Sequence, residues 1–285
     1  MKNIYMKNIY WFIKQSLTLD YRLFVVSKWS LSKKMMFYLI KYSLLIMRPF
    51  KKFKIGDDYA NLYGQKIFYD SPYGIAGYQS ILARHQYLLN LAEIKNLSLV
   101  IDVGANVGFF SKLIRELYPN SAIYSIEPIP ETYKCLELNF QNDKKTKTKK
   151  IALSDKQGVA KMSFNPDQSS VSHFDNKGKI GVVVETLDNF IAKNKIKLID
   201  LLKIDVEGFE HLVLKGAAKT LAKTNFLFIE ITVEDNRNYT LSSLMSQLYS
   251  SEFNFQLIGF RNYDDTSIGK MPVMDCLFRN VKLQD

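Results

Sequence analysis

The feature that most constrains this chain is the stretch at residues 99–108, which reads LVIDVGANVG. Its apolar residues, interrupted only by Asp102, predict a buried strand, and Gly104 and Gly108 predict a tight turn into a helix that begins near Val107. Glycine at position 104 lets the backbone approach a ligand closely, and the free amides at the start of the helix form a polar rim. Asp102 ends the strand at the edge where open α/β sheets bind their ligands. The stretch therefore predicts a seat for an adenosyl ligand.

Strands and helices alternate along the chain after this stretch. Because strands separated by helices at this spacing form parallel sheets, we expect an α/β fold with a doubly wound sheet. The lysine run at 144–150 is expected to be a solvated loop, and residues 158–185 are expected to be a β insertion that forms one wall of the site. The other expected strands are Ala122–Ile126, Ile151–Leu153, Leu198–Ile204, Asn225–Ile231, Phe255–Ile258 and Met274–Phe278, and the expected helices are Val107–Leu117, Pro130–Phe140, Leu187–Ala192, Gly208–Ala222 and Leu241–Leu248.

Glu127 is a second carboxylate that is expected at the end of a strand. It lies 25 residues after Asp102, at the end of the next expected strand. A carboxylate at that position can accept hydrogen bonds from both hydroxyls of a ribose, as acidic residues do in nucleotide-binding sheets. The alternative is an acid in a loop that faces solvent.

A second group of carboxylates lies in the stretch DLLKIDVEGFE at residues 200–210. The strand expected here ends in Asp205, and Glu207 opens the next helix, whose first turn carries Glu210 and His211. Two carboxylates two residues apart at the exit of a strand can serve as a base, as metal ligands or as charge partners of a cationic cofactor.

Several ordered motifs together resemble the FkbM family of S-adenosylmethionine-dependent methyltransferases. The motifs are LVIDVGANVGFFS, IEP, LLKIDVEGFE, VLKGA and FLFIEI, and VETLDNFI at the end of the insertion also fits. The resemblance covers about residues 98–235. It implies a class I, Rossmann-like methyltransferase with a seven-stranded, mostly parallel sheet, an antiparallel C-terminal strand and a β insertion. It also implies O-methylation of a sugar, glycan or glycolipid hydroxyl, or alternatively of a natural-product or other small-molecule hydroxyl.

The resemblance also implies a set of cofactor-binding residues. The glycine-containing loop would hold the methionine part of S-adenosylmethionine, Glu127 the ribose, and Ser154 or Asp155 the adenine. The full set is Asp102, Gly104, Ala105, Asn106, Gly108, Glu127, Pro128, Ser154, Asp155 and Asp205.

The expected chemistry is direct displacement at the sulfonium methyl group. Because the leaving group is positively charged, the protein mainly aligns an acceptor oxygen and excludes water. An alcohol is a weak nucleophile, so a nearby base helps, and Asp205 is the first choice, followed by Glu207 and His211. A divalent metal at Asp205 and Glu207 is an alternative, although the sequence shows no third ligand.

All of the net charge of +11 lies in residues 1–54, which hold twelve Lys or Arg residues and a single acid, Asp20. The rest of the chain has equal numbers of basic and acidic side chains. We therefore expect a basic helical arm at 1–54, a transition or cap segment at 55–97, and an S-adenosylmethionine-binding methyltransferase domain at 98–285.

Two interpretations of the arm follow from its mixture of lysines and apolar residues. Met35–Met47 is apolar apart from Lys41 and Ser43, but it is too short to span a bilayer, which takes roughly 20 residues, and it lies too deep for a signal peptide. The arm is either a helical cap on the body or an interfacial helix on an anionic membrane. In the second case Phe37, Leu39, Leu44 and Leu45 enter the lipid, and Lys33, Lys34, Arg48, Lys51 and Lys52 contact the headgroups.

Other functional classes fit less well. Gly104 and Gly108 form G-x-x-x-G rather than the G-x-G-x-x-G of NAD(P)-dependent oxidoreductases. The neutral body has no basic stripe for a nucleic acid, and its carboxylates argue against a non-catalytic membrane-binding module. Cys135 and Cys276 match neither a disulfide framework nor a zinc site, which indicates a reducing compartment. We expect a cytoplasmic protein, peripheral at the inner membrane face if the arm binds lipid.

Overall fold

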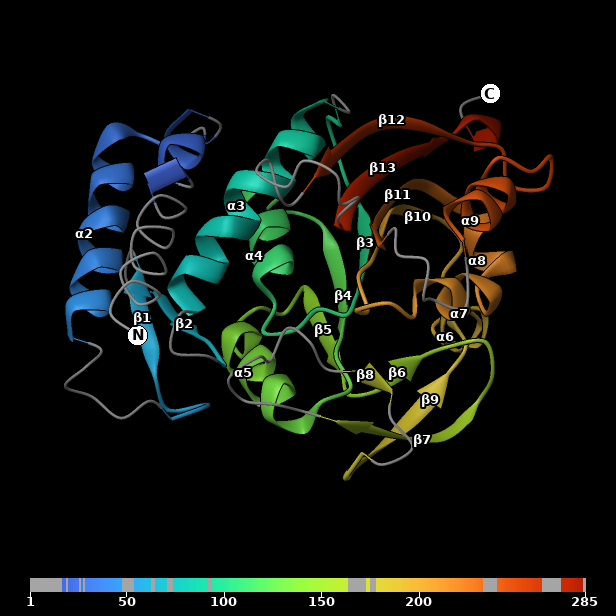
Figure 1. Cartoon of the computed structure of the whole chain (residues 1–285), viewed down its shortest axis with the longest axis horizontal. Helices are drawn as coiled ribbons and strands as arrows, with labels where there is room; N and C mark the ends of the chain where they lie inside the picture. The colour runs from blue at the N-terminus through green and yellow to red at the C-terminus, as the bar shows by residue number, and fades with distance from the viewer. Residues whose placement is uncertain are drawn as a thin grey trace, which may run out of the picture.

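A seven-stranded sheet forms the centre of the molecule (Figure 1). The structure is a computed structural model that describes residues 17–18, 20–25, 27, 29–47, 54–62, 65–70, 74–91, 94–163, 173–174, 178–232, 240–262 and 273–283. The strand order is β12-β13-β11-β10-β3-β4-β5, and only β13 runs antiparallel to the others. The expected doubly wound sheet with its antiparallel C-terminal strand is therefore confirmed. The strands are β3 (Leu99–Val103), β4 (Ala122–Ile126), β5 (Thr146–Lys149), β10 (Ile199–Ile204), β11 (Thr224–Thr232), β12 (Phe255–Asn262) and β13 (Val273–Asn280).

Helices cover both faces of this sheet because its strands are apolar on both sides. In β3, Val100 packs into one core with Phe110 and Leu113, and Ile101 packs into a second core with Leu187 and Val213. Successive side chains of a strand point to opposite faces, which explains the two cores. The first face carries α3 (Gly74–Leu91), α4 (Phe109–Leu117) and α5 (Pro130–Phe140), and the second carries α6 (Leu187–Lys193), α7 (Glu210–Lys215), α8 (Ala218–Leu221) and α9 (Leu241–Leu248).

Two helix boundaries differ from expectation for identifiable reasons. Helix α4 begins at Phe109 rather than Val107, because Gly108 before it has a left-handed backbone with φ of 89°. The helix expected over 208–222 is divided into α7 and α8 at Gly216. There the backbone passes so close to the Ser154 carbonyl oxygen that a Cβ atom would lie 2.1 Å from it.

The expectation of a loop at the lysine run 144–150 is wrong. The run contains β5, an edge strand of the central sheet. Thr146 is buried and the neighbouring lysines are exposed, so the segment TKTK alternates as a strand does. Lysines are common on edge strands because they block pairing with other chains. The strand expected at 151–153 is β6 (Ala152–Leu153), and it belongs to a different sheet.

The β insertion forms this second sheet. Its four strands have the order β6-β9-β7-β8 and surround a small core that contains Met162, Val182 and Val184. The insertion strands are β7 (Gly158–Ser163), β8 (His173–Phe174) and β9 (Ile180–Glu185).

Before the central sheet, the chain forms α2 (Leu31–Met47) and a hairpin of β1 (Tyr59–Leu62) and β2 (Gln65–Phe68). Phe37 of α2 is fully buried, and its ring centroid lies 6.5 Å from that of Tyr78 in α3, which in turn lies 5.1 Å from Phe109 in α4. The expectation that Phe37 enters lipid is therefore wrong, because the side chain belongs to the core. Leu44 also packs against this core.

Other parts of the arm are only partly described. Arg48, Lys51 and Lys52 lie outside the described residues, as does the side chain of Leu45. Within the described residues, no helix combines the length and the apolar character that a membrane crossing requires.

Candidate active site

The loops after β3 and β10 touch each other at the carboxyl edge of the sheet. A Cβ atom at Gly104, where φ is 72°, would lie 1.8 Å from the carbonyl oxygen of Asp205, and the Asp205 amide donates to the Val103 carbonyl over 3.1 Å. The neighbour that requires glycine at 104 is thus the Asp205 loop. Gly108 is required by the packing of α5, because a Cβ atom there would lie 2.5 Å from the ring of Phe140.

Lys203 of β10 contacts both of these loops. This lysine of β10 is 2% exposed, and its Nζ lies 3.1 Å from Asp205 Oδ2 and 3.4 Å from Asp102 Oδ1. It also donates to the Gly104 carbonyl over 3.3 Å. Burial opposes the charge of this lysine, but the charges of Asp205 and Asp102 outweigh burial and hold the pKa of Lys203 above its usual value. The ion pair with Lys203 therefore orients the Asp205 carboxylate.

Asp102 takes part in this arrangement from a fully buried position. Its Oδ2 accepts a hydrogen bond of 2.7 Å from Ser111 of α4, and Ser111 also contacts Ser125 of β4. The described contacts of Asp102 are with Lys203 and Ser111, and Lys203 in turn contacts the Gly104 loop. The predicted contact with the methionine part of the cofactor stays a prediction.

Glu127 lies at the end of β4 and faces the loop after β3. It is 6% exposed, so it is not a solvent-facing loop acid. One carboxylate oxygen accepts from the Asn106 amide over 3.0 Å, and the other accepts from the Ile129 amide over 2.9 Å. Burial raises the pKa of Glu127 to about 7, against the opposing effect of these two amide bonds and with a smaller contribution from the charge of Asp70.

Three carboxylates gather where the carboxyl ends of β10 and β11 meet. Oxygen atoms of Asp205, Glu207 and Glu230 all lie within 4.8 Å of one another. We call these three residues the acidic cluster. Glu207 has a φ of 55°, and its turn is held by Glu210, which is buried and accepts from the Val206 and Gly208 amides over 3.0 Å each. The cluster thus brings together the two carboxylates expected from the sequence and adds Glu230.

Glu230 differs from the other two members of the cluster in its environment. It lies in β11, is 6% exposed, and stands opposite the buried Asp275 of β13. Burial, followed by the negative charges of Asp205 and Glu207, raises the pKa of Glu230 to about 10. The raised pKa favours the protonated form of Glu230, which lowers the repulsion in the cluster. In its ionised form Glu230 would also supply a hard divalent cation with the third oxygen ligand that the sequence did not show.

The remaining predicted residues lie around these loops. Asn106 has a φ of 52° and contributes its amide to Glu127, while Ala105 is buried against Phe140 and Pro128 is half-buried. His211 is half-buried in the first turn of α7, outside the acidic cluster. Their proposed roles are not tested by these positions.

Ser154 and Asp155 follow β6 of the insertion sheet rather than a strand of the central sheet. The amide of the buried Ser154 donates to the Glu185 carbonyl over 2.9 Å, and its hydroxyl lies 3.2 Å from the carboxylate of the exposed Asp155. The predicted contact of these residues with adenine stays a prediction.

Comparison with known proteins gives a consistent result. The model of the Methyltransferase FkbM domain matches residues 102–257, which include Glu127 and the acidic cluster. The 31-O-demethyl-FK506 methyltransferase FkbM of Streptomyces tacrolimicus is 28% identical over 173 residues, which cover 49% of this chain and 66% of that protein. The 2-O-methyltransferase NoeI of Sinorhizobium fredii is 26% identical over 183 residues, with 57% and 74% covered. The hexuronic acid methyltransferase AglP of Haloferax volcanii is 26% identical over 145 residues, with 50% and 59% covered.

Proposed function

Because this chain belongs to the FkbM family of methyltransferases, we propose that it transfers a methyl group from S-adenosylmethionine to a hydroxyl of a sugar, glycan or glycolipid. The observation that supports the proposal is the contact between the Gly104 loop and the Asp205 loop, because it brings the glycine turn that we expect to hold the cofactor close to the acidic cluster. The names of AglP and NoeI support a sugar acceptor and O-methylation, respectively. The FkbM relative is named for a different acceptor, 31-O-demethyl-FK506, which supports the alternative of a natural-product hydroxyl.

The residues of the site fit such a reaction. S-adenosylmethionine would supply a methyl group bound to a sulfonium. The leaving group, S-adenosylhomocysteine, is neutral at sulfur and needs no acid. Glu127 is held by two amides with lone pairs remaining on both oxygens, and these can accept the two ribose hydroxyls. Asp205 would take the proton of the acceptor hydroxyl, and the hydroxyl oxygen would receive the methyl group, with S-adenosylhomocysteine as the leaving group. The ion pair with Lys203 orients Asp205, and the raised pKa of Glu230 favours its neutral form, which limits the negative charge around Asp205.

The test is a methyl-transfer assay with the full chain, S-adenosylmethionine and two acceptor panels, one of sugars and glycolipids and one of hydroxylated small molecules without sugars. We expect S-adenosylhomocysteine to form and a sugar product to gain the mass of one methyl group. Methylation confined to the non-sugar panel would overturn the acceptor class, and methylation at nitrogen or carbon would overturn O-transfer.

Glu127→Gln is expected to weaken S-adenosylmethionine binding and to remove the part of the pH dependence of that binding that comes from Glu127. Ribose hydroxyls donate to an ionised carboxylate, and a pKa of about 7 leaves Glu127 only about one-tenth ionised at pH 6. The affinity of the wild-type protein should therefore rise about tenfold between pH 6 and pH 8. Calorimetric titration of both proteins measures this, and the slope that remains in the variant reports the titration of the cofactor itself. Equal slopes in the two proteins would contradict the ribose role.

We also propose that α2 places the protein on an anionic membrane surface at the cytoplasmic face. The side of α2 opposite Phe37 is apolar and exposed, with Leu39 69% and Ile46 68% exposed. We call this side the outer stripe, and it consists of Leu31, Met35, Leu39, Tyr42 and Ile46. The helical residues before α2 add four exposed side chains, Leu17, Tyr21, Phe24 and Val25.

The charge of the arm supports an anionic partner. Asp20 is the only acid among twelve basic residues in 1–54, and the buried Lys41 holds it in an ion pair of 2.7 Å. The combination of an exposed apolar face with an excess of basic residues in the sequence is typical of helices that lie in a membrane interface.

The double variant Leu39→Glu/Ile46→Glu is expected to reduce binding to phosphatidylglycerol vesicles by about tenfold or more, because it places two acids in the outer stripe. Both side chains are exposed, so folding should be preserved. The matched control is Val159→Glu/Val183→Glu, which makes the same change on exposed residues of the insertion sheet. Co-sedimentation measures binding. Unchanged vesicle binding of the arm variant would contradict the proposal. It would also be contradicted if the wild-type protein bound no vesicles and formed a dimer that the variant converted to a monomer, because the outer stripe would then be a protein interface.

A further inference from the structure

A pocket lies on the outer side of α4, away from the acidic cluster. It has a volume of about 680 Å³ and is lined by residues of α2, the β1–β2 hairpin, α3, α4 and the end of α5. None of its lining residues belongs to the cofactor-binding or catalytic set. Pockets of 300–1,000 Å³ are of the size that holds a small molecule.

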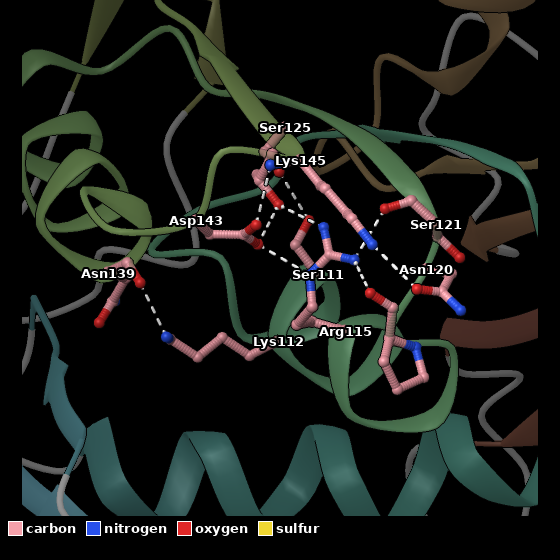
Figure 2. Close-up of polar contacts among 11 residues, drawn as sticks. Ser111, Lys112, Arg115, Asn120, Ser121, Ser125, Asn139, Asp143 and Lys145 are labelled. Atoms are coloured by element: carbon pink, nitrogen blue, oxygen red, sulfur yellow. Dashed lines mark hydrogen bonds and ion pairs between the residues drawn. The ribbon is translucent and has the colours of Figure 1, made fainter.

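Four basic and two acidic side chains line this pocket, so it is positively charged. The two acids are already paired: Asp143 with Arg115 over 2.8 Å, and Glu116 with Lys33. Arg115 also donates to the Pro119 carbonyl over 2.9 Å and to the Ser121 carbonyl over 2.7 Å, and Figure 2 shows the contact with Ser121. The other two cations, Lys66 and Lys112, form no ion pair with a carboxylate among the described residues.

Lys112 is the cation placed most favourably for a ligand. Its ammonium lies 4.9 Å from the centroid of the Phe140 ring and donates to the Asn139 carbonyl over 2.7 Å, away from the Arg115 network (Figure 2). An ammonium has three N–H donors, and the described contacts use one of them. Burial lowers the pKa of Lys112 to about 8, against the opposing charge of Asp143. An anion in the pocket would therefore meet a partly desolvated charge, where electrostatic attraction is stronger than in water.

The rest of the lining indicates the shape of the ligand. Gln65 and Asn142 supply amide groups, whereas Leu62, Ile67 and Tyr78 supply apolar and aromatic surface. A bare anion would leave that surface without a partner. The lining thus suits an anionic group attached to an uncharged body that packs against the apolar side.

We propose that this pocket binds a small molecule that carries a phosphate group, with the phosphate at Lys112 and the uncharged body against Leu62 and Tyr78. A sugar phosphate and a phospholipid headgroup share this chemistry. The site is separate from the proposed methyl transfer, and binding can be measured without cofactor or acceptor.

The test is calorimetric titration of the full chain with three probes: inorganic phosphate, a hexose 1-phosphate and a soluble short-chain phosphatidylglycerol. The wild-type protein should bind at least one organic phosphate more tightly than inorganic phosphate. Tighter binding of the hexose phosphate identifies a soluble ligand, and tighter binding of the lipid identifies a headgroup. The absence of binding by all three probes at millimolar concentration would overturn the proposal.

Lys112→Met should weaken this binding about tenfold or more, because it removes a cation but keeps the volume of the side chain. The matched control is Lys145→Met, which removes an exposed lysine that contacts Asn120 nearby but does not line the pocket (Figure 2). Thermal unfolding and S-adenosylmethionine affinity should match the wild type in both variants, which shows that the pocket variant is folded.

Two further measurements separate this pocket from other anion sites. Because the pKa of Lys112 is about 8, wild-type affinity should fall about tenfold between pH 7 and pH 9, and the Lys112→Met variant should show a smaller fall. Saturation with S-adenosylmethionine should leave binding of the phosphate probe in place. Competition between the two ligands, or equal pH dependence in the two proteins, would overturn the assignment.

Discussion

Asp205→Asn is expected to lower kcat about 10²–10⁴-fold, the usual contribution of a general base. Asparagine has nearly the same shape and can still accept from Lys203, but it cannot take the proton of the acceptor hydroxyl. Asp205 also belongs to the predicted cofactor-binding set, so S-adenosylmethionine affinity should fall as well, but by far less than kcat, because Glu127 and the Gly104 loop are untouched. Steady-state methyl transfer and calorimetric titration measure the two quantities on the same protein.

The matched control for this experiment is Glu207→Gln, which removes one carboxylate charge from the same cluster. If Asp205 is the base, the Glu207 variant should retain far more activity than the Asp205 variant. Equal losses would assign the effect to the charge of the cluster rather than to proton transfer. Retention of turnover by Asp205→Asn would show that another group is the base.

Lys203→Met is expected to lower the free energy of unfolding by about 3–5 kcal/mol, because removal of one partner leaves a buried charge uncompensated. Asp102 has no exposed surface and faces this lysine, and Asp205 is 19% exposed at the side chain. Urea denaturation measures the loss. Activity should also fall, since Asp205 loses the contact that orients it.

A second substitution makes the stability effect specific to the buried charge. Asp102→Asn in the Lys203→Met background should recover part of the lost stability, because it removes the charge left without its partner. Lys215→Met, at an exposed position in α7, should stay within about 0.5 kcal/mol of the wild type. A double variant no more stable than Lys203→Met alone would contradict a role of Lys203 as counterion of Asp102.

The central sheet was predictable from the sequence because its strands are apolar and separated by amphipathic helices. β3, β10 and β11 are buried on both faces and appear as short apolar runs. β5 was missed, since the five lysines around two threonines at 144–150 suggested an exposed loop. The strand depends on its neighbour β4 for hydrogen bonds, which composition does not reveal.

Two residues of the candidate site could have been found from a simple signal. Lys203 in LLKI and Glu230 in FIEI are each a lone charge in an apolar strand, and such charges are almost always paired or functional. Their partners could not be identified, because the pairing of Lys203 with Asp102 depends on which strands are neighbours in the sheet. The burial of Phe37 was equally hidden, since apolar residues occur on both sides of α2.

The position of β13 has a consequence for synthesis on the ribosome. β12 pairs only with β13 among the described strands, and β13 lies between β12 and β11. A chain made from its N-terminus therefore presents the edge of β11 unpaired until residues 273–280 have emerged. Glu230 and its opposite neighbour Asp275 meet only at that moment. The nascent protein thus completes this edge of the sheet and buries Glu230 in one late step. A stalled chain that lacks β13 leaves the edge of β11 unpaired and should be prone to aggregate through it.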